Sequence, residues 1–129
     1  MNLLNEDRTF RRGEIYLADL GFGYGSEQGG IRPVVVLQNN MGNIYCPTLI
    51  VAPLTSRVDK KPNQPTHYYI SGDGKKIRPS VVLLEQIKTI DKRRVLEKLG
   101  CLSSLDMDNM KEHILISLGI SIPDEVEAP

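Results

Sequence analysis

The chain contains no tryptophan, and its aromatic residues are limited to five tyrosines and two phenylalanines among 129 residues. It has two cysteines, Cys46 and Cys101, far apart and not at a spacing typical of metal ligands, so neither a disulfide framework nor a zinc site is expected. We expect two reduced, partly buried thiols, which suits a cytosolic protein. The chain also lacks a run of about 18 apolar residues, so no membrane-spanning helix is expected.

Net charge is absent as well, because 16 Lys and Arg residues balance 16 Asp and Glu residues. A neutral total argues at first against a nucleic-acid partner. The charges are separated, however. Residues 75–98 hold eight basic residues against three acids, and residues 99–129 hold one lysine against six acids. The basic segment can form a local binding face or an ordinary solvated surface, and the composition leaves both open.

The length fits one domain that needs no disulfide or metal to be stable. The segment from Met1 to Arg12 has two acids among its first seven residues and no apolar core, so it does not resemble a signal peptide. We expect a flexible N-terminal arm over residues 1–10, a folded domain over 11–119 and an acidic tail over 120–129.

Short segments rich in β-branched and other apolar residues predict strands. They cover residues 13–20, 31–38, 48–55, 66–71, 80–84 and 95–102. The runs that start at Ile31 and Ser80 are continuously apolar, as in strands buried on both faces. Residues 39–43 are typical of a turn and 57–65 of a mobile loop. Pro53 is expected to mark a strand end or a bulge.

One helix is predicted near the C-terminus. Ser103 is a plausible N-cap with Asp106 three residues on, and Gly119 suits the C-terminal cap. The apolar stripe of Met107, Met110, Ile114 and Leu118 is expected to pack on the core. With a short helical turn over residues 91–94, the pattern predicts a mainly β domain, a small barrel or curled sheet, closed by one helix.

The segment Gly25 to Pro33 carries most of the chemistry. Its three glycines, Gly25, Gly29 and Gly30, permit close approach of another backbone or a ligand. Glu27, Gln28 and Arg32 place charged and polar groups on this segment, just before a rigid strand. The only histidines, His67 and His113, lack partners at motif spacing, and no phosphate-binding loop or metal-ligand motif is present. An enzyme built from these residues would use Arg, hydroxyl and carboxylate groups, without a metal or other cofactor.

Several segments occur in the order found in the MazF/PemK toxins, which the chain resembles over roughly residues 11–119. They are residues 12–16 (RGEIY), 25–33 (GSEQGGIRP), 38–39 (QN), 47–48 (PT), 52–55 (APLT), 84–86 (LEQ), 89–94 (TIDKRR) and 115–119 (LISLG).

The resemblance implies an SH3-like β-barrel of the MazF/PemK/CcdB type with short helical turns, assembled as a homodimer. It also implies the toxin of a type II toxin–antitoxin pair, with a cognate antitoxin protein as partner and no membrane association. The activity implied is that of a cytoplasmic, sequence-specific, metal-independent endoribonuclease. Such enzymes cut single-stranded mRNA by 2′-OH attack, leaving 2′,3′-cyclic phosphate and 5′-OH ends, which inhibits translation.

By the same resemblance, Arg32 and Thr55 occupy catalytic positions. A guanidinium offers two parallel donors that match a phosphate, which suits Arg32 to this role. Glu27 and Glu85 are both candidate acid–base groups. Candidate RNA-binding residues are Gln28, Gly29, Gly30, Asn39, Asn43, Gln86, Lys88, Arg93 and Arg94, and the flexible loop carries Phe22, Tyr24 and Gly25. The two loop aromatics can stack on bases or form a hydrophobic flap.

Two observations bear on alternatives. Ile31-Arg32-Pro33 recurs as Ile77-Arg78-Pro79, which we interpret as proline recurring at strand starts, so Arg78 is not expected to be a second catalytic arginine. The alternative function is a non-enzymatic, gyrase-binding toxin of the same fold. Such toxins rely on a tryptophan near the C-terminus, and this chain has none. The shortage of aromatics also disfavours a peptide-binding module.

Overall fold

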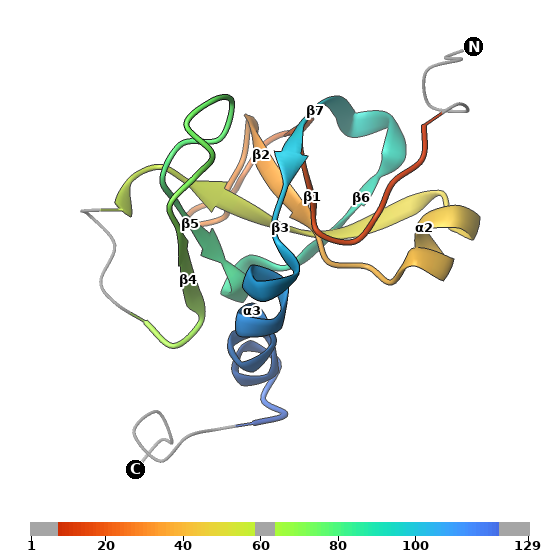
Figure 1. Ribbon diagram of the computed structural model, residues 1–129. Helices are drawn as coiled ribbons and strands as arrows, with labels where there is room; N and C mark the ends of the chain where they lie inside the picture. Colours follow the sequence, from red (N-terminus) through yellow and green to blue (C-terminus); the bar gives the residue numbers. More distant parts are fainter. Residues whose placement is uncertain (1–7, 59–63, 122–129) are drawn as a thin grey trace.

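Figure 1 shows the computed structural model, which describes residues 8–58 and 64–121. The strands are β1 (Glu14–Asp19), β2 (Ile31–Val36), β3 (Thr48–Thr55), β4 (His67–Ile70), β5 (Ser80–Leu83), β6 (Lys88–Asp91) and β7 (Val95–Cys101). The helices are α2 (Asn40–Tyr45) and α3 (Ser104–Ser117), and two 3₁₀ turns, η2 (Leu84–Gln86) and η3 (Lys92–Arg94), lie between strands.

The strands form one antiparallel sheet in the order β4-β5-β3-β2-β1-β7, and β6 pairs with β3. β3 organises this sheet because it has three partners. Its first half pairs with β6, residues 51–53 pair with β2, and Leu54 and Thr55 pair with β5. The sheet therefore curls around β3, and within the described residues its outer strands β4 and β7 do not pair with each other. The predicted mainly β, barrel-like fold with a C-terminal helix is confirmed.

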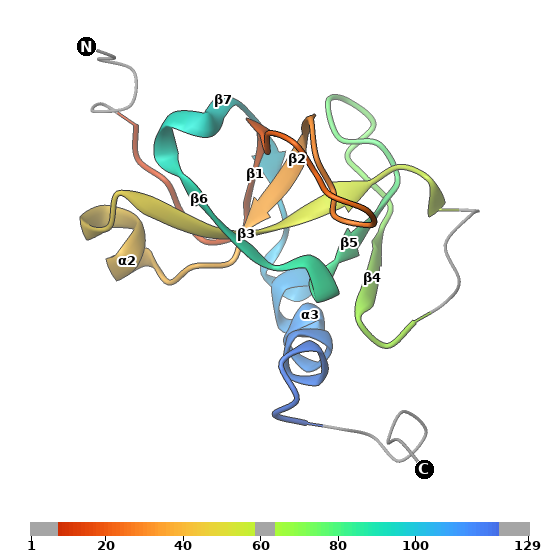
Figure 2. The same cartoon turned by 180° about the vertical axis from the view of Figure 1, so that it is seen from behind.

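Both faces of the central strands are buried, as the continuous apolar runs predict. Val34 and Val36 pack with Tyr16 and Phe10 in one core, whereas Val35 packs with Ile15 in the other. Successive strand residues point to opposite faces, so a strand covered on both sides needs apolar residues at every position. The second core is closed by α3, which lies below the sheet in both Figure 1 and the view from behind in Figure 2.

The limits of α3 follow its capping residues. The Ser103 hydroxyl accepts a hydrogen bond from the Asp106 backbone N–H at 3.0 Å. At the other end Gly119 has φ of +75°, and the N–H groups of Gly119 and Ile120 donate to the carbonyls of Ile116 and Leu115. This is the glycine-ended cap that the sequence predicts.

Not all of the predicted apolar stripe on α3 is buried. Met107 and Met110 lie in the core and Ile114 packs against it, but Leu118 is 59% exposed. The prediction was wrong for Leu118, because it is the C-cap residue and extends past the sheet surface that α3 covers.

Several further predictions need correction. The predicted flexible arm over residues 1–10 is wrong for residues 8–10, since Phe10 is buried against the Tyr16 ring and Arg8 donates two hydrogen bonds to β7 carbonyls. Residues 1–7 and the tail from residue 122 lie outside the described residues. Cys46 and Cys101 are both exposed rather than partly buried, because one follows a surface helix and the other ends an outer strand.

The turn predicted over residues 39–43 is instead the start of α2, because the Asn39 side chain accepts a hydrogen bond from the Gly42 N–H and caps the helix. Pro53 neither ends β3 nor bulges it, but pairs with Val34 inside the strand. The predicted loop 57–65 is described only at its two ends. Strand β6 was not predicted, since its sequence is short and half polar.

Within the described residues no helix has the length and apolar character to cross a membrane.

Candidate active site

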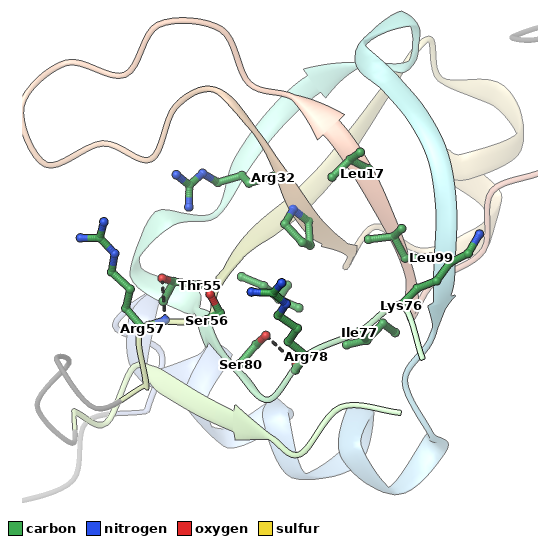
Figure 3. Close-up of a pocket in the computed structure, with 12 residues that line it drawn as sticks. Leu17, Arg32, Thr55, Ser56, Arg57, Lys76, Ile77, Arg78, Ser80 and Leu99 are labelled. Carbon is green, nitrogen blue, oxygen red and sulfur yellow. Dashed lines mark hydrogen bonds between the residues drawn. The ribbon is translucent and has the colours of Figure 1, made fainter. Parts of the chain in front are cut away.

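The best-formed site lies where β3 ends. β2 and β5 flank β3 on its two edges and run antiparallel to it, so the beginnings of both strands lie beside the end of β3. Thr55 is the last residue of β3, and Arg32 is the second residue of β2. The sheet thus brings together the two residues that the sequence singles out for catalysis, although 22 positions separate them. Figure 3 shows both beside one cavity.

Arg32 is held by the glycine-rich loop. Its Nε donates to the Gly29 carbonyl at 2.9 Å, while no partner among the described residues occupies its two terminal nitrogens. Gly29 is required at this place, because a Cβ atom there would lie 2.4 Å from the backbone nitrogen of Gly23. The side chain is therefore fixed through Nε and keeps the two-pronged end of its guanidinium available for an anion.

Thr55 offers a hydroxyl to the same cavity. The residue is 7% exposed, and its Oγ1 accepts a hydrogen bond of 3.3 Å from the Arg57 backbone N–H. This bond uses one lone pair of Oγ1 and leaves the hydroxyl hydrogen available for an oxygen acceptor in the cavity. The two groups together can hold a phosphate from two sides.

The cavity has a volume of about 430 Å³, within the range of small-molecule sites. Leu17, Pro33, Leu54, Ile77 and Leu99 supply an apolar lining, and Thr55, Ser56 and Ser80 supply hydroxyls. The charged lining residues within the described part of the chain are all basic: Arg32, Arg57, Lys76 and Arg78. Such a lining favours a phosphate-bearing ligand.

The glycine-rich loop before β2 is tied down on its other side by Gln86. The Gln86 amide accepts from the Gln28 N–H at 2.8 Å and donates to the Ser26 carbonyl at 3.3 Å. Glu27 closes a turn within the loop by accepting from the Tyr24 N–H at 2.8 Å. Phe22 and Tyr24 are 88% and 78% exposed, so both rings are accessible for stacking.

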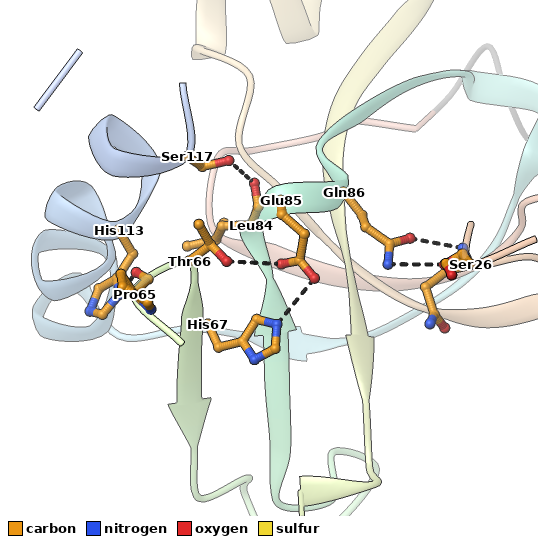
Figure 4. Close-up of polar contacts among 10 residues, drawn as sticks. Ser26, Pro65, Thr66, His67, Leu84, Glu85, Gln86, His113 and Ser117 are labelled. Carbon is orange, nitrogen blue, oxygen red and sulfur yellow. Dashed lines mark hydrogen bonds and ion pairs between the residues drawn. The ribbon is translucent and has the colours of Figure 1, made fainter. Parts of the chain in front are cut away.

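Both candidate acid–base residues lie in a second cavity rather than beside Arg32. This cavity, of about 500 Å³, is lined by Ser26, Glu27, Glu85, Gln86, Ile87 and Lys88. Glu85 there receives a hydrogen bond of 3.3 Å from the Thr66 hydroxyl and lies 3.1 Å from His67 Nε2, as Figure 4 shows. The structure therefore places Arg32 and Thr55 at one cavity and Glu27 and Glu85 at another. The glycine-rich loop lines the second cavity, and its Gly29 carbonyl accepts the hydrogen bond from Arg32 Nε.

Two predicted RNA-reading residues have structural roles at the far end of β3, beside α2. Asn43 is buried, with its amide bonded to Gln38 and Asn40, and the Asn39 side chain caps α2. The eight residues of β3 put this end about 25 Å from Thr55 at the usual strand rise. Since its side chain is already fully bonded in the interior, we remove Asn43 from the candidate RNA site.

Three of the eight basic residues in segment 75–98 are paired with acidic side chains. Lys98 bonds to Glu14, Lys76 to Glu97, and Arg93 makes two hydrogen bonds to Asp91. The Arg93 hydrogen bonds lower the pKa of Asp91 to about 2. Arg94 donates to the Asp19 carbonyl at the base of the glycine-rich loop, and Lys88 lines the Glu85 cavity.

Three basic residues of the Arg32 cavity, Arg57, Lys76 and Arg78, were assigned no binding role from the sequence. Arg57 and Lys76 carried no signal, since they lie in polar loops. Arg78 carried one, because its Ile-Arg-Pro tripeptide repeats that of Arg32. Within the described residues no group of three His, Cys, Asp or Glu side chains is arranged as metal ligands would be.

Fold and site together define a small, curled β-sheet protein with a cationic cavity at the end of its central strand. Residues 11–118 match the family of PemK-like, MazF-like toxins of type II toxin–antitoxin systems. The chain therefore belongs to this family.

A curated relative named Endoribonuclease MazF, from Staphylococcus saprophyticus, is 53% identical over 111 residues, covering 85% of this chain and 92% of the relative. Among solved structures, MazF from Deinococcus radiodurans superposes with a TM-score of 0.74 at 24% identity, covering 88% of this chain and 99% of that one. A mycobacterial endoribonuclease in complex with its cognate antitoxin has a TM-score of 0.71 at 23% identity, covering 88% of this chain and 98% of that one. At these identities the two structures support the fold alone.

Proposed function

We propose that this chain is the toxin of a type II toxin–antitoxin pair and acts as an endoribonuclease on single-stranded mRNA in the cytoplasm. The observation that carries the proposal is the placement of Arg32 and Thr55 at one cationic cavity. The 53% identity to a relative named as an endoribonuclease supports the same activity. Cutting mRNA at specific sequences would inhibit translation.

In the proposed reaction the 2′-OH attacks the adjacent phosphorus in line, and the bond from phosphorus to the 5′ oxygen of the next nucleotide breaks. The products are a 2′,3′-cyclic phosphate and a 5′-OH end. Negative charge grows on the phosphorane oxygens, where the free nitrogens of Arg32 and the Thr55 hydroxyl would donate hydrogen bonds. Prepositioned donors of this kind are often the largest catalytic contribution, about 3–4 kcal/mol for each one.

Arg32 does not suit the role of general base, because a guanidinium stays protonated in proteins. Glu27 and Glu85 are the candidate acid–base groups, and both flank the Gln86 amide that holds the loop. We propose that RNA spans both cavities, with Gln28, Gly29, Gly30, Gln86 and Lys88 contacting it along the loop. Comparing kcat for Glu27→Gln and Glu85→Gln identifies the base, because only its loss removes the limb of the pH profile that requires a carboxylate.

We also propose a homodimer and a cognate antitoxin as partners. An antitoxin segment rich in acidic residues would complement the four basic side chains of the Arg32 cavity. Occupation of this cavity by carboxylates would exclude the RNA phosphate and so inhibit the enzyme.

The test is cleavage of a long RNA by the purified protein in EDTA, followed by mapping of the cut ends. We expect cutting without metal, no cutting where the attacking 2′-OH is replaced by hydrogen, and a loss of about 10²-fold or more for Arg32→Ala. Arg32→Lys serves as a control that keeps the charge but removes the paired donors. Metal-dependent cutting, or an unchanged rate for Arg32→Ala, would contradict the mechanism.

A further inference from the structure

The Ile-Arg-Pro tripeptide occurs twice, and the sheet brings its two copies to the same place. Arg32 lies at the start of β2, and Arg78 lies two residues before β5. Because β2 and β5 flank β3 on opposite edges, the two arginines approach the end of β3 from its two sides. Both line the cavity that contains Thr55, and Figure 3 shows their side chains on either side of it.

Arg78 is held for this position by its backbone rather than by its side chain. The Ser80 hydroxyl donates to the Arg78 carbonyl at 2.7 Å, and Ile77 beside it is buried in the core. Within the described residues the Arg78 guanidinium makes no hydrogen bond and no ion pair. Its backbone is therefore anchored beside the cavity, and all of its guanidinium donors are available.

The other basic residue from the same loop differs in this respect. Lys76 also lines the cavity, but its ammonium lies 3.4 Å from a Glu97 carboxylate, which partly neutralises it. Among the residues that the structure describes, no carboxylate lines the cavity to neutralise Arg78. Arg32 and Arg78 thus form a pair of guanidinium groups in one cavity, where two neighbouring phosphates would be expected to bind.

We propose that Arg78 binds the phosphate next to the scissile phosphate on the same RNA strand. This inference rests on the proposed function, since it assigns the scissile phosphate to Arg32 and Thr55. Arg78 would act on substrate binding and register, because phosphate contacts of this kind fix the position of a strand without reading its sequence. It would touch the substrate but not the reacting phosphorus.

The first measurement is binding, which does not require cleavage. A fluorescent RNA of about a dozen nucleotides, with 2′-O-methyl groups at every position so that it cannot be cut, is titrated with wild type, Arg78→Ala and Arg78→Lys. We expect Arg78→Ala to weaken binding about tenfold and to reduce the slope of log affinity against log salt by about 0.7, the value for one lost phosphate contact on a single strand. Arg78→Lys should keep the slope and recover part of the affinity.

Lys75→Ala is the matched control. It removes one positive charge from the same exposed loop, but Lys75 does not line the cavity. We expect its affinity and salt slope to stay within about twofold and 0.2 of wild type, because exposed charges away from the site contribute little. An equal effect of both alanine variants would show a general charge effect and overturn the assignment of Arg78.

The second measurement couples Arg78 to a single phosphate. Uncharged methylphosphonate linkages are placed one at a time beside the cut. In wild type, one neighbouring position should lower kcat/KM about tenfold, mainly through KM. In Arg78→Ala the same replacement should have almost no further effect, as a double-mutant cycle requires for a direct contact. A penalty that is the same in both proteins at every position would overturn the inference.

These outcomes separate the two proposals. Wild-type protein that binds RNA through Arg78 but does not cut it would refute the proposed function alone. Protein that cuts RNA through Arg32, with Arg78→Ala binding and cutting as wild type does, would refute the role of Arg78 alone. Absence of both binding and cutting would refute both.

Discussion

At the scale of single residues, Thr55 combines a buried position with a hydroxyl directed to the cavity. We predict that Thr55→Ala lowers kcat about 10- to 100-fold, because it removes one hydrogen bond to a charged group, worth about 1.5–3 kcal/mol. Thr55→Ser keeps the hydroxyl and should retain most of the activity. Single-turnover cleavage measures the effect, and full activity of the alanine variant would remove Thr55 from the mechanism.

Glu14 illustrates a buried charge that serves stability. Its carboxylate accepts from Lys98 Nζ at 2.6 Å, from the Tyr16 hydroxyl at 2.7 Å and from the Arg11 N–H at 2.8 Å. Burial alone would raise the pKa of Glu14, but these hydrogen bonds outweigh it and hold the pKa below its usual value. Burial raises the pKa of Tyr16, so its hydroxyl stays protonated and donates to Glu14.

Folding lowers the pKa of Glu14, so the ionised carboxylate contributes to the free energy of unfolding. This contribution is fully present above the pKa of an unfolded glutamate, about 4.3, and is lost as the pH falls through the lower pKa of the folded protein. We predict that Glu14→Gln lowers the unfolding free energy by about 1–3 kcal/mol near neutral pH. The difference from wild type should shrink in acid. Urea unfolding across this pH range measures it, with Glu97→Gln in an exposed pair as control. A pH-independent difference would contradict the prediction.

At the scale of elements, the glycine-rich loop fixes Arg32 only if the backbone at Gly29 can lie close to the backbone at Gly23. A methyl group at Gly29 would lie 2.4 Å from the Gly23 nitrogen, so Gly29→Ala must displace the loop and the carbonyl that receives Arg32 Nε. We predict a loss of about 10- to 100-fold in cleavage rate, since small misplacements of catalytic groups have effects of this size.

The control is Gly74→Asn, in another exposed turn where φ is +71° and a Cβ atom would meet nothing within 4 Å. Asparagine tolerates this conformation, so its activity should stay near wild type. Thermal unfolding of both variants checks that the sheet is intact. A fully active Gly29→Ala protein would show that the loop does not position Arg32.

The N-cap of α3 allows a matched comparison of two adjacent serines. The Ser103 hydroxyl accepts a hydrogen bond from the Asp106 backbone N–H. Ser104 is the first residue of the helix and its side chain is exposed. We predict that Ser103→Ala lowers the unfolding free energy by about 1 kcal/mol and that Ser104→Ala changes it much less. Equal values from denaturant unfolding would show that the cap does not contribute.

At the scale of the whole molecule, large apolar side chains remain exposed on separate segments. They include Met41, Ile44 and Tyr45 of α2, Leu105 and Leu118 beside or within α3, and Ile120 after it. Met41, Ile44 and Tyr45 lie three and four positions apart and so share one face of α2, and a contiguous exposed apolar patch commonly marks a site of association. We predict a homodimer with twice the 14.4 kDa mass of the chain at micromolar concentration, measured by sedimentation. A monomer over the whole concentration range would contradict it.

Local patterns determined much of this protein before its fold was known. The bounds of β3, the capped ends of α3 and the doubly buried β2 follow from propensity, capping residues and apolar periodicity, all of which act over a few neighbouring residues. The ordered segments shared with the MazF/PemK toxins also indicated the family, and with it Arg32 and Thr55.

The tertiary structure decided which distant residues meet. It paired β2 and β5 with opposite edges of β3 and so placed Arg32 and Arg78 at one cavity. It also placed Glu85 at a separate cavity and buried Asn43 in the interior. Strand pairing between segments far apart in the chain leaves no local signal, because the same short apolar run can pair with many partners until the whole sheet fixes its register. The sequence therefore determined the elements and the family, whereas the composition of the cavity depended on how the curled sheet brings strand ends together.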